Sequence, residues 1–144
     1  MTEEDFMREA LREAENASRI GEVPVGAVVV CNGKIIARAH NLTETLNDPT
    51  AHAEMQVIGM AAEELGGKYL DKCTLYVTVE PCPMCAAALF WSQLGKLVYG
   101  ADDPKRGYSL FSPSLLHPRT IVEKGVLQQD CSSIVSRFFK DKRH

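Results

Sequence analysis

A chain of 144 residues and 15.9 kDa has the size of one domain, which we expect to span residues 1–144. Its 45% hydrophobic and 24% charged residues, with a net charge of −3, exclude a disordered or fibrous protein. The longest apolar runs, residues 25–31 and 85–91, are too short to cross a membrane, and the acidic start is unlike a secretory signal, so we expect a cytoplasmic protein with no membrane partner.

The first 40 residues predict a helix followed by a hairpin. A capping-box pattern begins at Thr2, and apolar residues then recur at helical spacing as far as Ile20. Asn32-Gly33 is a strong hairpin signal between two runs that read as strands, residues 25–31 and 34–40.

The middle of the chain predicts two more helices around a strand. Asp48 is the expected cap, and Pro49 the first turn, of a helix that runs through His52 to about Leu65. Residues 74–79 are β-branched and aromatic and predict a strand. Pro83 opens an apolar helix over residues 84–94.

The last third predicts a short strand at residues 97–99, an irregular stretch over 102–125 and a C-terminal amphipathic helix over 126–139. Strands that alternate with helices in the second half favour parallel neighbours in a layered α/β domain.

Charge is unevenly distributed along the chain. Residues 1–95 carry 7 Lys and Arg against 14 Asp and Glu, whereas residues 96–144 carry 9 against 5. The basic C-terminal third is either a nucleic-acid-binding face or a solvated surface, and charge alone favours the solvated surface.

The residues that point to chemistry are His52 and Glu54, then Cys82 and Cys85 in a Pro-Cys-Pro-Met-Cys segment. A Cys-x-x-Cys pair alone is either a redox motif or half of a zinc site. With His52 it supplies three ligands, which leaves a fourth position open for water, as in a catalytic zinc site. Glu54 lies about 200° round a helix from His52, so both reach one cavity only if that cavity lies over the helix end.

Other cysteines and histidines have less specific explanations. A fourth ligand from Cys73 or His40 would make the site structural instead of catalytic, which is the less favoured alternative. The remaining residues of these two types are expected to be core residues or to have no catalytic role: Cys31, Cys73, Cys131, His40, His117 and His144.

At these residues the chain resembles the zinc-dependent nucleobase deaminases, whose signature is His-x-Glu followed by Pro-Cys-x-x-Cys. Within the cytidine/deoxycytidylate deaminase superfamily it is most similar to the tRNA-specific adenosine deaminases. The segments that carry this likeness are residues 21–30, 47–54, 74–85 and 98–101, with Phe138-Phe139 and its basic neighbours near the end.

The resemblance implies a cytidine-deaminase-like three-layer α/β/α sandwich with a five-stranded mixed sheet. It implies one Zn²⁺ held by His52, Cys82 and Cys85, with Glu54 as the catalytic proton shuttle. The implied reaction is hydrolytic deamination of adenosine to inosine at the wobble position of a tRNA anticodon, by a homodimer.

The same resemblance implies further contacts with the RNA. Residues implied to contact the flipped nucleotide are Val23, Asn41, Ala53, Val79, Asp103 and Lys105. Residues implied to bind the anticodon stem-loop are Lys140, Lys142 and Arg143, which shifts the preferred interpretation of the tail toward nucleic-acid binding.

The sequence departs from the family pattern at Pro83, at Trp91 and in a shortened loop after Gly107. Pro83 is also common in guanine deaminases, and Trp91 resembles the base deaminases, so a deaminase of a free base or nucleoside (guanine, cytosine or cytidine) is the alternative. A non-catalytic zinc-stabilised RNA-binding subunit is a third possibility, against which the presence of Glu54 argues.

Overall fold

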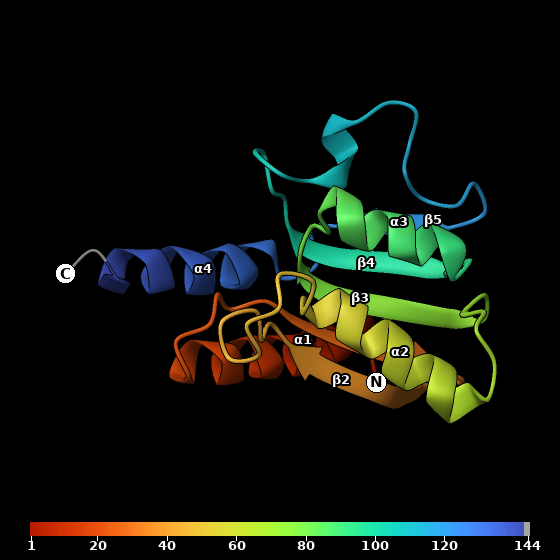
Figure 1. Ribbon diagram of the computed structural model, residues 1–144, viewed down its shortest axis with the longest axis horizontal. Coiled ribbons are helices and arrows are strands. Elements are labelled where there is room, and N and C mark those ends of the chain that lie inside the picture. Colours follow the sequence, from red (N-terminus) through yellow and green to blue (C-terminus); the bar gives the residue numbers. More distant parts are fainter. Residues whose placement is uncertain (143–144) are drawn as a thin grey trace.

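A computed structural model describes residues 1–142 as one five-stranded sheet between two pairs of helices (Figure 1). The strands lie side by side in the order β2-β1-β3-β4-β5. The elements in chain order are α1 (Glu3–Arg19), β1 (Gly26–Cys31), β2 (Lys34–His40), α2 (Ala53–Leu65), β3 (Cys73–Val79), α3 (Pro83–Trp91), β4 (Lys96–Ala101), the 3₁₀ turn η1 (Tyr108–Leu110), β5 (Ile121–Lys124) and α4 (Gln128–Lys142).

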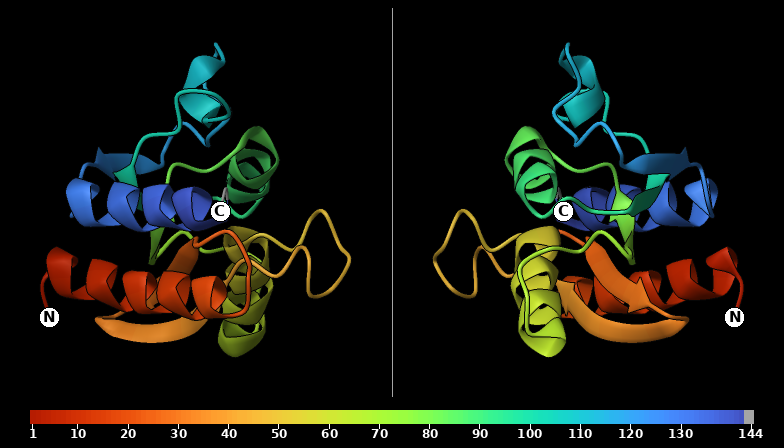
Figure 2. Two further views of the ribbon diagram at one scale, coloured as in Figure 1. Left: turned by 90° about the vertical axis from the view of Figure 1, so that its left-hand side faces the viewer. Right: turned by 90° about the vertical axis from the view of Figure 1, so that its right-hand side faces the viewer.

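The sheet is mixed. Strand β1 pairs antiparallel with both β2 and β3, whereas β3 with β4 and β4 with β5 are parallel pairs. Helices α1 and α4 cover one face and α2 and α3 the other, as the two side views show (Figure 2). The predicted three-layer α/β/α sandwich with a five-stranded mixed sheet is therefore confirmed.

Each face of the sheet has its own core. On one side, Met7 and Ala10 of α1 pack against Val28 and Val98. On the other side, α2 and α3 pack against the sheet and against each other. This arrangement places the N-termini of α2 and α3 next to one another, which positions the candidate site.

The predicted start of the second helix was wrong. Helix α2 begins at Ala53, with His52 as its N-cap residue. Asp48 instead accepts hydrogen bonds from Thr50 N at 2.8 Å and Thr50 Oγ1 at 2.7 Å, which stabilises a separate turn around Pro49. A Pro after an Asx residue favours a turn as well as a helix start, so the sequence pattern was ambiguous here.

Two other boundaries also differ. Helix α3 ends at Trp91 and not near residue 94, because Gln93 adopts a left-handed backbone with φ 52°. Residues 121–124, expected to be irregular, form the edge strand β5, whose mostly exposed side chains give no alternating pattern. No helix within residues 1–142 has the length and apolar character needed to span a bilayer.

Candidate active site

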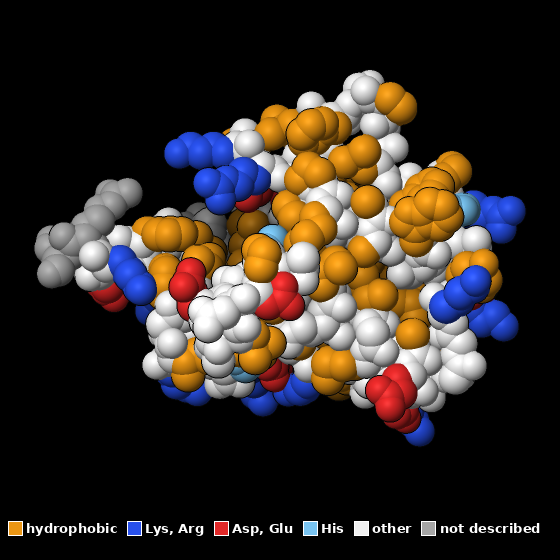
Figure 3. All heavy atoms as spheres, in the orientation of Figure 1, with side chains coloured by type: hydrophobic (Ala, Val, Ile, Leu, Met, Phe, Trp, Pro, Cys, Tyr) orange, Lys and Arg blue, Asp and Glu red, His pale blue; other side chains and the backbone are white. Residues whose placement is uncertain are grey.

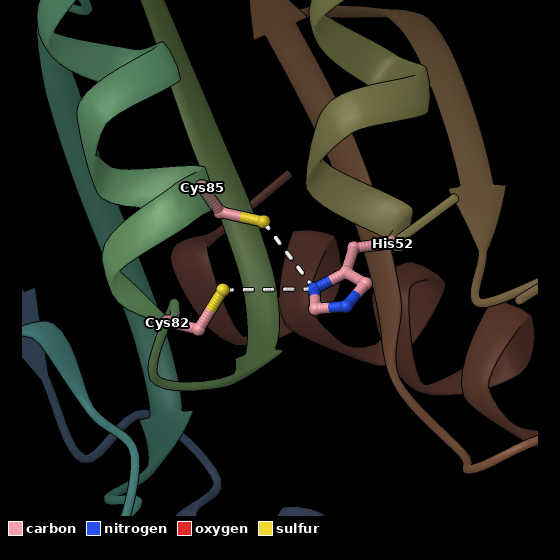
Figure 4. A group of neighbouring side chains, drawn as sticks. All are labelled: His52, Cys82 and Cys85. Carbon is pink, nitrogen blue, oxygen red and sulfur yellow. Dashed lines mark hydrogen bonds between the residues drawn. The ribbon is translucent and has the colours of Figure 1, made fainter. Parts of the chain in front are cut away.

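Three possible metal ligands meet where α2 and α3 begin (Figure 4). His52 is the N-cap residue of α2, Cys82 is the N-cap residue of α3, and Cys85 lies in the first turn of α3. Their ligand atoms all lie within 4.8 Å of one another. His52 Nδ1 faces both sulfur atoms, at 3.7 Å from Cys82 Sγ and 3.5 Å from Cys85 Sγ.

These distances fit a tetrahedral metal ion. A nitrogen at about 2.05 Å and a sulfur at about 2.3 Å from a tetrahedral centre are about 3.6 Å apart. The two nitrogen–sulfur distances in the structure bracket that value. Two thiols and one imidazole also form a ligand set suited to a divalent metal with one coordination position left open.

The electrostatics of the group favour a thiolate. A hydrogen bond from the Cys85 thiol, with a contribution from His52, lowers the pKa of Cys82 to about 4 against the opposing effect of burial. The hydrogen bond with Cys82 raises the pKa of His52. The same thiol–thiol hydrogen bond and burial raise the pKa of Cys85, and a bound cation would deprotonate this second thiol as well.

Neither alternative fourth ligand joins the three residues. His40 Nδ1 lies 2.9 Å from Glu13 Oε1, on the opposite side of strand β2 from α2. Cys73 pairs directly with Cys31 across β1 and β3. In the part of the chain that the structure describes, the metal-ligand group contains three residues.

Glu54 lies in the first turn of α2, close to the metal-ligand group. Its side chain is 3% exposed, and burial raises its pKa to about 7. Among the described residues, Glu54 Oε1 and Asn41 Oδ1 are the two buried side-chain oxygen or nitrogen atoms that lack a hydrogen-bond partner. Unpaired buried acceptors are costly, so both atoms are available for a ligand or a water molecule.

A cavity of about 280 Å³ lies over the N-terminal end of α2, the position at which His52 and Glu54 can both reach it. Its lining combines apolar, hydrogen-bonding and charged side chains, which suits an aromatic base with polar edges. The lining residues are Val23, Val25, Asn41, Thr43, His52, Ala53, Glu54, Val79, Glu80, Cys82, Asp103 and Arg106.

Four of these lining residues were not singled out from the sequence: Val25, Thr43, Glu80 and Arg106. The resemblance implied that Lys105 contacts the substrate. In the structure the neighbouring Arg106 lines the cavity, and Lys105 is exposed. No local sequence pattern distinguishes Glu80 from a surface glutamate, because its hydrogen-bond donors, Asp103 N and Ser109 N, come from a distant loop.

Two buried carboxylates hold the loops on either side of the cavity. Glu22 accepts hydrogen bonds from Thr45 N and Thr45 Oγ1, at 2.6 and 2.7 Å, and from Glu44 N at 3.2 Å. Burial by itself would raise the pKa of Glu22, but these hydrogen bonds keep it below its ordinary value. Glu80 has the corresponding position on the other side, against the loop that contains Asp103.

The basic residues expected to bind RNA lie at the end of α4. Lys140 and Lys142 are exposed in its last turn, and Lys142 Nζ lies 5.4 Å from the centre of the Phe138 ring. Arg143 lies outside the described residues. Helix α4 extends beyond the sheet, and the surface is hollowed between it and the rest of the molecule (Figures 1 and 3).

Comparison with known proteins relates this site to one family. The family model of the MafB19-like deaminases matches residues 1–143. A tRNA-specific adenosine deaminase of Bacillus subtilis (strain 168) is 48% identical, over 99% of this chain and 92% of the relative. A tRNA-specific adenosine deaminase of Aquifex aeolicus (strain VF5) is 45% identical, over 100% of this chain and 98% of the relative.

Solved structures agree with these relatives. A structure from studies of A-to-I editing by tRNA:A34 deaminases superposes with a TM-score of 0.84 at 45% identity, covering 90% of this chain and 98% of that chain. The guanine deaminase of Bacillus subtilis, at 42% identity, gives a TM-score of 0.68 over 71% of this chain and 66% of its own. The full-length matches show that this chain is an enzyme and that it belongs to the family of the tRNA-specific adenosine deaminases.

Proposed function

We propose that this enzyme converts adenosine to inosine at the wobble position of a tRNA anticodon, with water as the second substrate and ammonia as the second product. The observation that supports it most is that the His52, Cys82 and Cys85 donors meet beside a cavity lined by His52, Cys82 and Glu54, whose Oε1 is unpaired. The names of full-length relatives supply the substrate class.

The metal is Zn²⁺, which suits a nitrogen–sulfur ligand set with tetrahedral spacing. When bound, zinc supplies a Lewis acid that makes a water molecule nucleophilic at neutral pH. Glu54 accepts a proton from the attacking water and transfers it to the ring nitrogen next to C6 of the adenine, while the water oxygen forms a bond to C6. The second proton of that oxygen passes through Glu54 to the amino group, the C6–N bond breaks, and ammonia leaves.

The remaining lining residues bind the flipped nucleotide. The unpaired Asn41 Oδ1 accepts a hydrogen bond from the nucleotide, and Val23 and Val79 pack on the faces of the base. The backbone N–H groups at Ala53 and Cys82 lie at helix N-termini, where free donors point outward and can position the base and the water.

Charged residues outside the base pocket bind the rest of the RNA. Asp103 lies by the ribose hydroxyl, and Lys105 and Arg106 are near a phosphate. The anticodon stem-loop meets the basic end of α4 at Lys140 and Lys142. Exposed Lys and Arg side chains on α4 and on the loop that contains Asp103 flank the hollow in the surface (Figure 3).

The enzyme acts as a homodimer through α3. This helix has no charged residue, yet Trp91 at its end is 76% exposed and stacks edge-on against Phe90. Large exposed aromatics on an uncharged helix are typical of a protein interface. Trp91→Lys is expected to turn a dimer into a monomer in analytical ultracentrifugation, and a parent that sediments as a monomer would contradict this part of the proposal.

The substrate is tested with a mass-spectrometric panel on the zinc-loaded protein. The panel contains an anticodon stem-loop with A at the wobble position, a matched stem-loop with that A moved one position 3′, free adenosine, cytidine, cytosine and guanine. We expect inosine only in the first RNA. Turnover of guanine or of a free pyrimidine compound would replace the substrate and favour the alternative deaminase activity.

A further inference from the structure

Glu80 is a buried carboxylate that the reaction above does not use. It follows β3 directly, two residues before Cys82, and is 5% exposed. Glu80 is also one of the residues that line the cavity. A carboxylate taken out of water needs hydrogen-bond donors, and the segment from residue 102 to residue 110, here named the 102–110 loop, supplies them.

Three donors of the 102–110 loop reach the two oxygens of Glu80. Asp103 N donates to Oε1 at 3.0 Å, and Ser109 N and Ser109 Oγ donate to Oε2 at 3.0 and 2.6 Å. Tyr108 N also donates to the carbonyl of Pro81 at 2.9 Å. One side chain thus binds both ends of the loop, through hydrogen bonds that the negative charge strengthens.

The loop fits closely around this carboxylate at Gly107. A Cβ atom added at Gly107 would lie 2.2 Å from Glu80 Oε2, far inside a van der Waals contact. The backbone of Gly107 has φ −67°, which any residue can adopt. Close approach to the hydrogen-bonded Glu80 carboxylate, and not backbone conformation, therefore favours glycine here.

The hydrogen bonds continue from Glu80 into the cavity wall. Asp103 Oδ1 accepts from Lys105 N at 3.1 Å and from Arg106 N at 3.0 Å. Asp103 and Arg106 both line the cavity on this side. Arg106 brings a planar cation that suits a phosphate oxygen to the same wall.

We propose that Glu80 is a positioning residue, whose carboxylate holds the 102–110 loop so that Asp103 and Arg106 form one fixed wall of the substrate cavity. The role of this wall in receiving RNA rests on the proposed function. The positioning itself does not, because it can be measured without substrate.

Limited trypsin cleavage tests the positioning, since the loop contains two consecutive trypsin sites, Lys105 and Arg106. In zinc-loaded Glu80→Gln, cleavage after these residues should be roughly tenfold faster than in the parent, because charge-assisted hydrogen bonds that close the loop are lost. Cleavage after Lys68, an exposed site between α2 and β3, should keep the parent rate. Glu22→Gln is the matched control: it alters a buried carboxylate with three loop donors and should not affect cleavage at Lys105 and Arg106.

Kinetics then test the consequence for substrate. With the anticodon stem-loop, Glu80→Gln should raise KM roughly tenfold and change kcat by less than about threefold, because Glu54 and the metal ligands stand on α2 and α3 and not on the loop. Metal content should stay at the parent value. A parent without activity on this RNA would overturn the proposed function but leave the cleavage result interpretable.

Parent-like cleavage at Lys105 and Arg106 in Glu80→Gln would overturn the inference. An equal increase at Lys68 would overturn it too, because it would show global instead of local opening. If Glu80→Gln does not fold, Ser109→Ala decides the question: it removes the shortest of the three hydrogen bonds, and about threefold faster local cleavage is expected.

Discussion

Replacing Glu22 by Gln should destabilise the protein in a pH-dependent way. The side chain of Glu22 is 1% exposed and its two oxygens accept three hydrogen bonds from Glu44 and Thr45. A glutamine keeps one acceptor oxygen, which can serve the two bonds from Thr45. It then presents its NH₂ group to Glu44 N and leaves that donor unpaired.

The size of the effect follows from these contacts. A donor left unpaired in this part-buried contact costs about 1 to 2 kcal/mol, and the two retained hydrogen bonds lose about 0.5 to 1 kcal/mol each when the acceptor becomes neutral. The free energy of unfolding should fall by about 3 kcal/mol. For a domain of this size the melting temperature should then fall by about 9 °C.

The sign of the pH dependence follows from the lowered pKa of Glu22. A carboxyl whose pKa is lower in the folded state stabilises the protein fully above its unfolded value, near 4.5, and loses that effect as the pH falls through the folded value. The difference in the free energy of unfolding between the parent and Glu22→Gln should therefore have its full value at pH 7 and become smaller below about pH 4.5.

Thermal unfolding of the zinc-loaded proteins at pH 7 and pH 4 measures this gap. Glu63→Gln, which changes an exposed carboxylate on α2, is the control and should have the same melting temperature as the parent. A Glu22→Gln protein that melts within about 1 °C of the parent at pH 7 would refute the account of this loop.

Four further changes have distinct expected outcomes. Glu54→Gln should keep its metal, as measured by elemental analysis, and its kcat should fall by about 10²- to 10⁴-fold. A kcat near that of the parent would contradict the proton shuttle. Cys82→Ser should lose both metal and activity, and a full metal content would remove Cys82 from the ligand set. Lys140→Ala with Lys142→Ala should weaken tRNA binding and flatten its salt dependence, whereas an unchanged salt slope makes these residues solvated surface. Gly26→Ala should lower stability by roughly 3 kcal/mol or more, since its Cβ would lie 2.0 Å from a carbonyl oxygen of α1, and an unshifted denaturation midpoint would contradict that packing.

The sequence predicted the elements that have a strong local period. The capping box at Thr2 and the hairpin turn at Asn32-Gly33 depend on neighbours in the chain, and the structure contains both. The edge strand over residues 121–124 was missed because its partners in β4 lie 25 residues earlier in the chain, as in the pair Lys96 and Ile121, and its side chains are mostly exposed.

The candidate site divides in the same way. His52 and Cys82 stand in a local motif with a recognisable ligand chemistry, so they could be proposed from the sequence. Glu22 and Glu80 could not, because their importance comes from loops that fold back onto them from 22 to 29 residues away. In the sequence, a glutamate that is buried against hydrogen-bond donors cannot be distinguished from one on the surface. The distinction needs the positions of its donors in the folded chain.

The most direct test of the account is a deamination assay in ¹⁸O-labelled water, with mass spectrometry of the nucleosides from an anticodon stem-loop. The zinc-loaded parent should produce inosine at the wobble position with one ¹⁸O atom, and release one ammonia for each inosine. The metal-depleted parent and Glu54→Gln should produce almost none. Inosine at other positions, or equal activity without metal, would contradict a hydrolysis carried out by His52, Cys82, Cys85 and Glu54.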